Sequence, residues 1–272
     1  YGRGNQIRVG GVTDALAAIS KTIELVGQPS PLYRSDQTYQ LLLERQVEGY
    51  RRSDPPSVPQ LAVPVAVPKH IYAEGLASKD AKKAHIGALV MTAFYYLLRV
   101  GEYTTPKFSM VNGKKVPATR TKQFTVGNIG FFKNGRIVKR SSPLKQLLAC
   151  DIATMKITNQ KNGKMGQTIS QHATGSTMCP VRALVHLTHH IKSNGGDDDT
   201  LLCSYFKNDQ WHTVDSHQIV SRVKEATKDL NLKDQGIDPD LVAAHSLRAG
   251  GAMALKLHGY NDTTIMKMGR WT

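Results

Sequence analysis

Apolar residues recur at helical spacing in two stretches near the start of the chain, over residues 12–26 and 39–51. Apolar positions three and four residues apart lie on one face of a helix, so we predict two amphipathic helices. Prolines then cluster in residues 53–68, where they favour extended backbone and end helices. We therefore predict a helical module over residues 1–52, a linker over residues 53–68, and a larger domain over residues 69–272. Two helices bury little surface alone, so the first module is expected to be part of a larger one or to dock on another.

The larger domain begins with the pattern of a long helix, capped by Ser78 and running to Leu98. Residues 123–174 have a different pattern, because apolar residues alternate there with polar ones, as at Ala153, Met155 and Ile157. The pair Asn162-Gly163 is typical of a tight turn between two antiparallel strands. A small antiparallel sheet is predicted for this stretch.

Helical patterns return in the last third of the chain. Pro180 begins a helix through Ile191 that ends before two glycines, Asp215 or Ser216 caps a second helix, residues 247–258 form a third, and Asp262 caps a short last one. The predicted fold class is mainly α with a small antiparallel β-sheet (α+β), preceded by a small helical domain.

Positive charge is concentrated in one part of the sequence. The chain of 272 residues has a net charge of +15, and residues 99–164 hold 14 lysines and arginines against two acidic residues, Glu102 and Asp151. A surplus of one sign creates a field that attracts a polyanion, whereas mixed signs serve solubility. We therefore predict a nucleic-acid partner rather than an anionic membrane.

The remaining composition excludes several classes of protein. The longest apolar run, residues 86–98, is too short to span a bilayer. The three cysteines have no metal-site spacing, which predicts reduced thiols and an intracellular location. The chain begins at Tyr1 rather than Met, so the sequence leaves a missing leader open.

A histidine and an arginine begin one predicted helix. His245 and Arg248 are three positions apart and share a helix face, so both can reach a single ligand. Arginine matches two phosphate oxygens with its planar fork, and histidine exchanges a proton near neutral pH. Gly250 and Gly251 follow at once, and glycines inside a helix indicate a close backbone approach.

Three other residues could act on the same ligand. Arg99 follows the long apolar helix, and Glu102 is placed to steady the turn that follows it. Taken alone, Arg99 could equally be a residue at the end of a helix that donates hydrogen bonds to the last carbonyl groups. Lys161 is at the predicted hairpin turn, where most lysines are merely solvated. Trp271 follows Gly269-Arg270, and an isolated tryptophan is by default part of a core.

Taken together and in this order, these residues resemble the tyrosine recombinase (phage-integrase-like) family. That family uses an arginine after a long helix, a hairpin lysine, an H-x-x-R pair, a later His or Trp and finally a nucleophilic tyrosine. The matching residues are Arg99, Lys161, His245, Arg248 and Trp271. The resemblance covers residues 69–272, and residues 1–52 resemble part of the family's core-binding domain, which clamps DNA. The segment of residues 97–103 resembles the corresponding segment in recombinases of eukaryotic mobile elements, which would imply a nuclear location.

The resemblance implies transesterification at a phosphodiester of double-stranded DNA. Arg99 and Arg248 would bind the non-bridging oxygens, Lys161 would protonate the leaving 5′ oxygen, and His245 would assist proton transfer. Trp271 would pack beneath the phosphate. In the family the tyrosine follows the His or Trp, whereas this chain stops at Thr272, so we assign no nucleophile within it and expect the domain to be truncated before that tyrosine. Tyr260 precedes Trp271 and is not assigned.

The resemblance also implies partners and cofactors. Protein cations replace metal ions in this chemistry, so no metal or other cofactor is expected. Family members act as homotetramers on DNA, and we expect this chain alone to be a monomer. His186 and His190 are four positions apart on a predicted helix, but zinc would need further ligands that the sequence does not indicate.

Three alternatives remain open at this stage. A recombinase-derived DNA-binding protein that no longer cuts DNA would keep the basic surface, but it has no need of all four of Arg99, Lys161, His245 and Arg248. A type IB topoisomerase relative shares the catalytic logic, although the N-terminal helices and short length favour a recombinase. A generic basic RNA-binding protein predicts none of the spacing.

Overall fold

The computed structural model describes residues 7–55, 60–111, 114–117, 121–158 and 166–271. The chain divides into two compact units, Tyr1–Val58 and Pro59–Thr272, which are described separately.

The first unit contains the two predicted helices, α1 (Val9–Leu25) and α2 (Leu41–Ser53), which contact each other. The backbone N–H of Val9 donates to the carboxylate of Asp54 over 2.7 Å. Large apolar side chains nevertheless stay exposed, including Leu25 at 80% and Leu42 at 81%. The two helices therefore leave much of their apolar surface uncovered within this unit.

The first helix of the second unit was not predicted, because its start lies within the proline-rich stretch. Helix α3 (Ala66–Ala77) includes Pro68 in its first turn, although residues 53–68 were predicted to be a linker. A proline is tolerated there because the first N–H groups of a helix have no intrahelical partner. The later part of the predicted linker is also packed, since Val63 is 1% exposed and its N–H donates to the carbonyl of Ser246.

The next helix, α4 (Ala81–Tyr95), is the long apolar helix of the sequence pattern. It is shorter than predicted, and Asp80 rather than Ser78 caps it by accepting from the N–H of Lys82 at 2.8 Å. Every residue from His85 to Phe94 is buried. Because α3, α6, α8 and β7 all contact α4, this helix is the centre of the core.

The predicted antiparallel sheet is present. It has the strand order β4-β3-β5-β6, formed by β3 (Ile129–Lys133), β4 (Arg136–Val138), β5 (Ile152–Lys156) and β6 (Thr168–His172), with α5 (Leu144–Leu148) between β4 and β5. Strands β5 and β6 pair as a hairpin, and the predicted turn at Asn162-Gly163 lies outside the described residues. The fold class, mainly α with a small antiparallel sheet, is thereby confirmed.

Two further strand pairs were not predicted. They are β1 (Phe108–Val111) with β2 (Lys114–Pro117), and β7 (Ser204–Lys207) with β8 (Gln210–Thr213). Asn208 and Asp209 connect β7 to β8 with φ angles of 52° and 58°. Asn and Asp tolerate this left-handed conformation, so their pairing was the overlooked turn signal.

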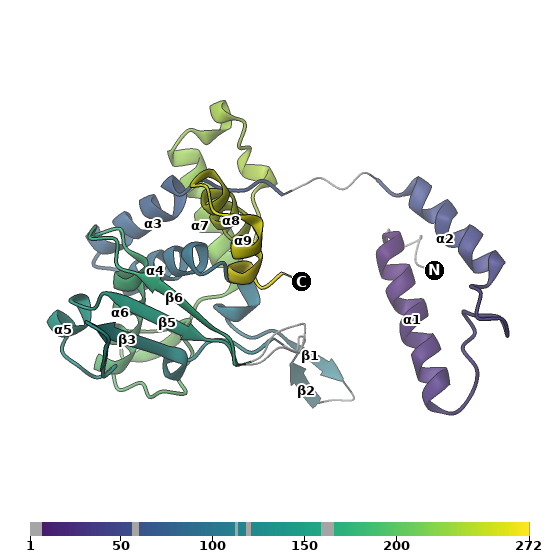
Figure 1. Cartoon of the computed structure of the whole chain (residues 1–272), viewed down its shortest axis with the longest axis horizontal. Coiled ribbons are helices and arrows are strands. Elements are labelled where there is room, and N and C mark those ends of the chain that lie inside the picture. Colours follow the sequence, from purple (N-terminus) through teal and green to yellow (C-terminus); the bar gives the residue numbers. More distant parts are fainter. Residues whose placement is uncertain (1–6, 56–59, 112–113, 118–120, 159–165, 272) are drawn as a thin grey trace. The chain divides into compact units, whose positions relative to one another are not determined.

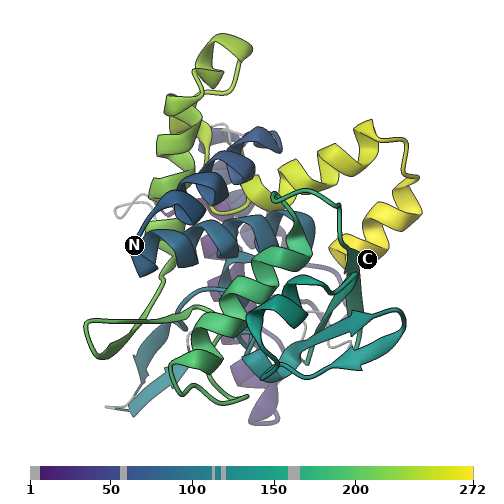
Figure 2. The same ribbon diagram turned by 90° about the vertical axis from the view of Figure 1, so that its left-hand side faces the viewer.

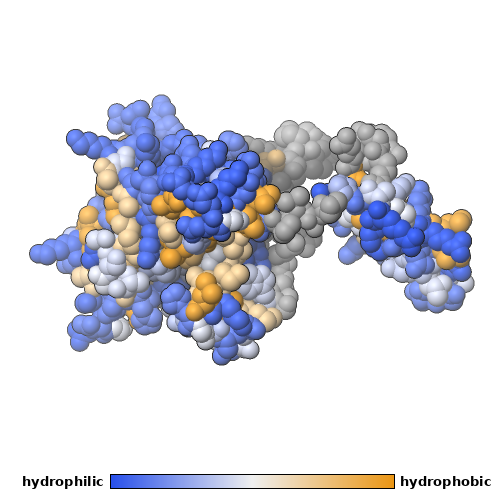
Figure 3. Space-filling model, turned by 90° about the horizontal axis from the view of Figure 1, so that it is seen from above, coloured by the Kyte–Doolittle hydropathy of each residue, from blue (hydrophilic) through white to orange (hydrophobic). Residues whose placement is uncertain are grey.

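The C-terminal helices follow the sequence pattern closely. They are α6 (Pro180–Ser193), α7 (Ser216–Asp229) capped by Asp215, α8 (Ser246–Leu257) and α9 (Asp262–Gly269). The cap of α9 is Asn261, not the predicted Asp262. Figure 2 shows α8 and α9 (yellow) as a helical hairpin whose end lies beside the sheet, where the side chain of Gln167 donates to the carbonyl of Lys267. On the face drawn in Figure 3 the second unit is mainly hydrophilic, with small hydrophobic patches.

Helix α8 lies very close to α4, as the two glycines indicated. A Cβ on Gly251 would collide with the carbonyl oxygen of Phe94 and with the side chain of Leu97. A Cβ on Gly250 would collide with the carbonyl oxygen of Val63. Only glycine therefore allows the start of α8 to approach the end of α4.

We predict that Gly251→Ala destabilises the protein by about 1 to 3 kcal/mol, because overpacking would push α8 away from α4. The urea midpoint of the variant, compared with the wild type, measures the effect. Gly49→Ala in α2 is the control, since a Cβ there meets nothing within 4 Å. An unchanged midpoint for Gly251→Ala would show that α8 can shift without cost.

Candidate functional site

The end of α4 forms the floor of the candidate site. Leu97 follows this helix in a left-handed conformation, with φ 49°, and its side chain is fully buried. Its carbonyl oxygen accepts from Arg248 at 2.8 Å and from Arg270 at 3.0 Å. One backbone carbonyl therefore joins the end of α4 to α8 and to the end of α9, which are both distant from α4 in the sequence.

Glu102 lies in the short 3-10 helix η1 (Val100–Glu102) directly after this turn, and it is 2% exposed. Its carboxylate accepts from the backbone N–H of Arg99 at 2.8 Å and pairs with the Arg99 guanidinium at 3.4 Å. Glu102 is therefore bonded to both the backbone and the side chain of Arg99, and its predicted role at the site stays a prediction. Arg270 binds both oxygens of the same carboxylate, at 2.7 and 2.9 Å.

Arg248 extends from α8 into the site and is 5% exposed. It donates to the carbonyls of Leu97 and Gly269, and its guanidinium lies 4.7 Å from the ring centre of Trp271, within cation–π range. Burial, followed by the charges of Arg99 and Arg270, lowers the pKa of Arg248 to about 10, and Glu102 opposes the shift. The side chain remains charged at neutral pH.

Trp271 reaches Arg248 because the chain turns back after α9. Arg270 has a φ of 56°, and the N–H of Trp271 returns to the carbonyl of Met266 at 3.0 Å. The indole is 39% exposed and lies against Gly269. The structure thus brings Trp271 together with Arg99, Glu102 and Arg248.

The other two predicted residues are placed differently. His245 is the N-cap residue of α8 and is exposed, one turn before Arg248. Lys161 lies outside the described residues. The structure therefore assembles the two arginines, the tryptophan and the glutamate, and it gives His245 a position at the same helix start.

Tyrosines near Arg99 have structural roles. Tyr96 is buried and donates its hydroxyl to the carbonyl of Ala153 at 2.9 Å. Burial raises the pKa of Tyr103, and the neighbouring Glu102 raises it further. Tyr260 is half exposed and follows α8. A buried phenol with a raised pKa is a poor nucleophile, which argues against Tyr96 and Tyr103, and the assignment of no nucleophile stays a prediction.

Arg270 is the residue that sequence reasoning missed. Its side chain is fully buried, although it stands beside the predicted Trp271. The available signal was Glu102, the only acidic residue from Arg99 to Cys150. A buried carboxylate requires a cationic partner, and the basic residue within Gly269-Arg270-Trp271 was a candidate for it.

The cluster carries more positive than negative charge. Three guanidiniums, of Arg99, Arg248 and Arg270, surround the carboxylate of Glu102. Arg99 is 25% exposed at its side chain, so the excess can be reached from solvent. Planar guanidiniums held in fixed positions bind tetrahedral oxyanions through paired hydrogen bonds. The chemistry that the arrangement favours is recognition of a phosphate group.

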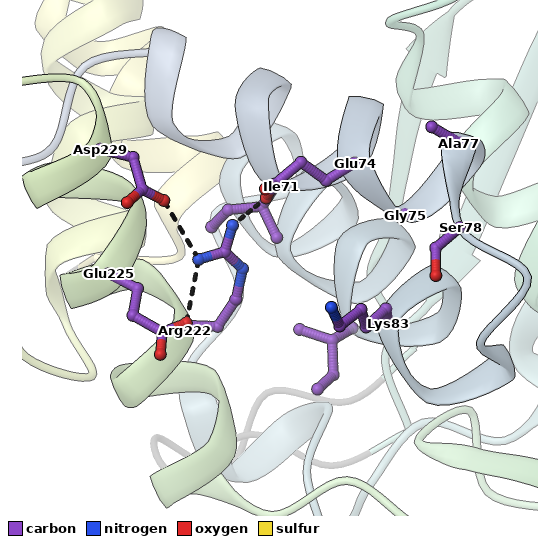
Figure 4. Close-up of a pocket in the computed structure, with 10 residues that line it drawn as sticks. Ile71, Glu74, Gly75, Ala77, Ser78, Lys83, Arg222, Glu225 and Asp229 are labelled. Atoms are coloured by element: carbon purple, nitrogen blue, oxygen red, sulfur yellow. Dashed lines mark hydrogen bonds and ion pairs between the residues drawn. The ribbon is translucent and has the colours of Figure 1, made fainter.

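A separate cavity of about 610 Å³ lies between α3, α4 and α7 (Figure 4). Among the described residues, His70, Glu74 and Asp229 are the group whose ligand atoms lie within 4.8 Å of one another. Arg222 already pairs with Glu74 and with Asp229, the latter at 3.5 Å. These carboxylates are therefore engaged in ion pairs, and the expectation of no metal stays a prediction.

The histidines of α6 do not form a ligand set in the described parts of the chain. The Nε2 atom of His190 accepts from the backbone N–H of Phe206 at 2.9 Å. Burial lowers the pKa of both His186 and His190. No helix within the described ranges is long and apolar enough to cross a membrane.

We predict that inorganic phosphate stabilises the protein against heat more than chloride does at matched ionic strength, because it offsets the repulsion between guanidiniums. At a concentration ten times its Kd the gain would be about 1.4 kcal/mol. The control is Arg248→Met, which keeps the apolar stem and removes the charge, and in which only the general salt effect should persist. An equal response of both proteins would mean that the cluster binds no phosphate.

No protein-family model and no curated protein matches this chain. A solved structure described as the XerH site-specific recombinase bound to difH substrate, in a pre-cleavage complex, is similar with a TM-score of 0.49 and 12% sequence identity. The similarity covers 94% of this chain and 55% of that one, so this chain spans about half the length of that protein.

Proposed function

We propose that this protein is of the recombinase type, binding duplex DNA and activating a phosphodiester for transesterification through a 3′-phosphotyrosine. The observation that carries the proposal is the meeting of Arg99, Arg248 and Trp271, three of the residues that resemble the tyrosine recombinase set, around one buried carboxylate. Arg99 is distant in the sequence from Arg248 and Trp271, and the chemistry that the three support together is phosphate recognition.

The charge distribution supports a polyanion as the partner. Exposed basic residues continue through the sheet region and its connections, at Lys122, Lys133, Arg136, Lys139, Lys145 and Lys156. Arg140 differs from these because it pairs with Asp198. Lysines and arginines at the surface supply contacts to phosphates that position a duplex without reading its sequence.

In the proposed mechanism, Arg99 and Arg248 hold the non-bridging oxygens and stabilise the charge that builds in the pentacoordinate transition state. Trp271 closes one side of this pocket. Lys161 gives a proton to the leaving 5′ oxygen, and His245 assists proton transfer at the attacking hydroxyl. The attacking tyrosine is not assigned to this chain. Assembly as a homotetramer on DNA belongs to the same proposal.

We predict that DNA affinity falls steeply with salt, because each neutralised phosphate releases counterions. A plot of the logarithm of the association constant against the logarithm of the salt concentration should have a slope of about −0.9 for each phosphate contacted. Fluorescence anisotropy with a labelled duplex of mixed sequence measures it. Arg99→Ala and Arg248→Ala should each weaken binding by about tenfold, as expected for loss of a hydrogen bond to a charged group. Lys233→Ala, an exposed lysine on a different segment, is the control. A flat salt response would contradict a phosphate-binding surface.

The transesterification step can be tested without an attacking tyrosine. We predict that the protein accelerates the rejoining half-reaction on a nicked duplex bearing a 3′-(4-nitrophenyl) phosphate next to a 5′-hydroxyl. The 5′ oxygen attacks phosphorus, the bond to the nitrophenyl oxygen breaks, and Lys161 accepts the hydroxyl proton while 4-nitrophenolate leaves. Absorbance of the nitrophenolate and appearance of the sealed strand report the reaction, in a pool of duplexes with randomised flanks.

Loss of one preorganised donor typically costs about 100-fold or more in rate, so Arg99→Ala and Arg248→Ala should abolish most of the acceleration. Lys161→Ala should slow the reaction while leaving DNA affinity nearly unchanged, because it acts on the proton and not on binding. Tight DNA binding by the wild type with no release of nitrophenolate would favour the alternative, a recombinase-derived DNA-binding protein that no longer cuts.

A further inference from the structure

Arg270 is buried more completely than any other cation of the candidate cluster. Its side chain is 0% exposed, and both of its terminal nitrogens bind Glu102. Its Nε atom has no hydrogen-bond partner among the described residues. Burying a guanidinium is costly unless it is paired, so this residue depends on Glu102 for its position.

Arg270 and Arg99 compete for the same carboxylate. Arg270 approaches it through two contacts of 2.7 and 2.9 Å, whereas the Arg99 guanidinium makes one contact at 3.4 Å. The hydrogen bonds of Arg248 go to the carbonyls of Leu97 and Gly269 instead. The negative charge is therefore taken up mainly by Arg270, so Glu102 leaves the charges of Arg99 and Arg248 largely uncompensated.

The backbone at Arg270 also indicates a role for its side chain. Its φ of 56° is the left-handed conformation that glycine adopts most easily at the end of a helix. A non-glycine residue held there is stabilised by its surroundings. Here the surroundings are Glu102 and the carbonyl of Leu97, and the turn they hold directs Trp271 back over Arg248.

We propose that Arg270 is a positioning residue of the phosphate site, which neutralises Glu102 and fixes the turn that places Trp271 on Arg248. Its effect on DNA rests on the proposed function, namely phosphate binding by Arg99 and Arg248. Its effect on Trp271 does not, because that contact exists without DNA. The two effects are therefore measured separately.

The first measurement follows Trp271 in the absence of DNA. The chain has two tryptophans, so Trp211→Phe leaves Trp271 as the only one and serves as the background for every variant. Arg270→Met should shift the emission of Trp271 to longer wavelength and increase its quenching by acrylamide, and Arg270→Lys should recover part of the change. Lys267→Met, an exposed lysine of the same helix, is the matched control. An unchanged Trp271 spectrum in folded Arg270→Met would overturn the positioning of the tryptophan.

The second measurement uses charge restoration. Arg270→Met lets Glu102 neutralise Arg99, so DNA affinity should fall by about tenfold. Adding Glu102→Gln removes that carboxylate and returns the cluster to its original net charge, while the amide oxygen can still accept from the N–H of Arg99. Affinity of the double variant should return to within about threefold of the wild type, a coupling that a double-mutant cycle isolates.

A purely structural role makes the opposite prediction, because two changes in one buried pair would leave the double variant no better than Arg270→Met. That result, with circular dichroism showing all variants folded, would overturn the neutralising role of Arg270. If Arg270→Met does not fold, the double variant still decides the question, since an apolar and a neutral residue leave no unpaired buried charge. Weak, salt-independent DNA binding by the wild type would instead refute the proposed function, and the Trp271 measurement would stand on its own.

Discussion

The candidate site depends on the carbonyl of Leu97, which accepts hydrogen bonds from Arg248 and Arg270 at the end of the central helix. Leu97 ends this helix in the left-handed conformation, which is a common form of helix end. The left-handed Leu97 directs its carbonyl toward α8 and α9, and its buried side chain holds it there. The central helix is thereby joined at one backbone atom to α8 and to the end of α9, through residues 151 and 173 positions further along the chain.

Close packing makes this junction possible. Gly250 and Gly251 let α8 approach α4 so closely that Arg248 can reach past the helix end. The same approach explains why Arg248 is buried, and burial is the largest cause of its lowered pKa. The glycines are thus part of the electrostatics of the site as well as of its packing. A looser α8 would give Arg248 more solvent and less defined geometry.

Sequence patterns predicted the fold well where periodicity or caps were strong. Helices α6 and α7 and the β5–β6 pair follow from Pro180, Asp215 and an alternating pattern, because these signals are local. Helix α3 was missed because Pro68 is harmless in a first turn but looks like a helix breaker in sequence. Arg99, Arg248 and Trp271 were singled out from their residue types and positions, and their order along the chain gave the family resemblance. Arg270 was not singled out, because its importance comes from a pairing with Glu102 across most of the chain.

The cluster holds more positive than negative charge, which stability alone does not require. A fold that needed only a buried ion pair could use Arg270 and Glu102 alone, and apolar residues could replace even these. Adding Arg248 places a further cation where burial and like charges both oppose ionisation. At a pKa of about 10 it still carries its charge at neutral pH, so the folded state retains an unfavourable interaction. An oxyanion bound between Arg99 and Arg248, as we propose, would supply a negative charge that offsets this interaction, while the hydrogen bonds of Arg248 to the carbonyls of Leu97 and Gly269 hold the helices together.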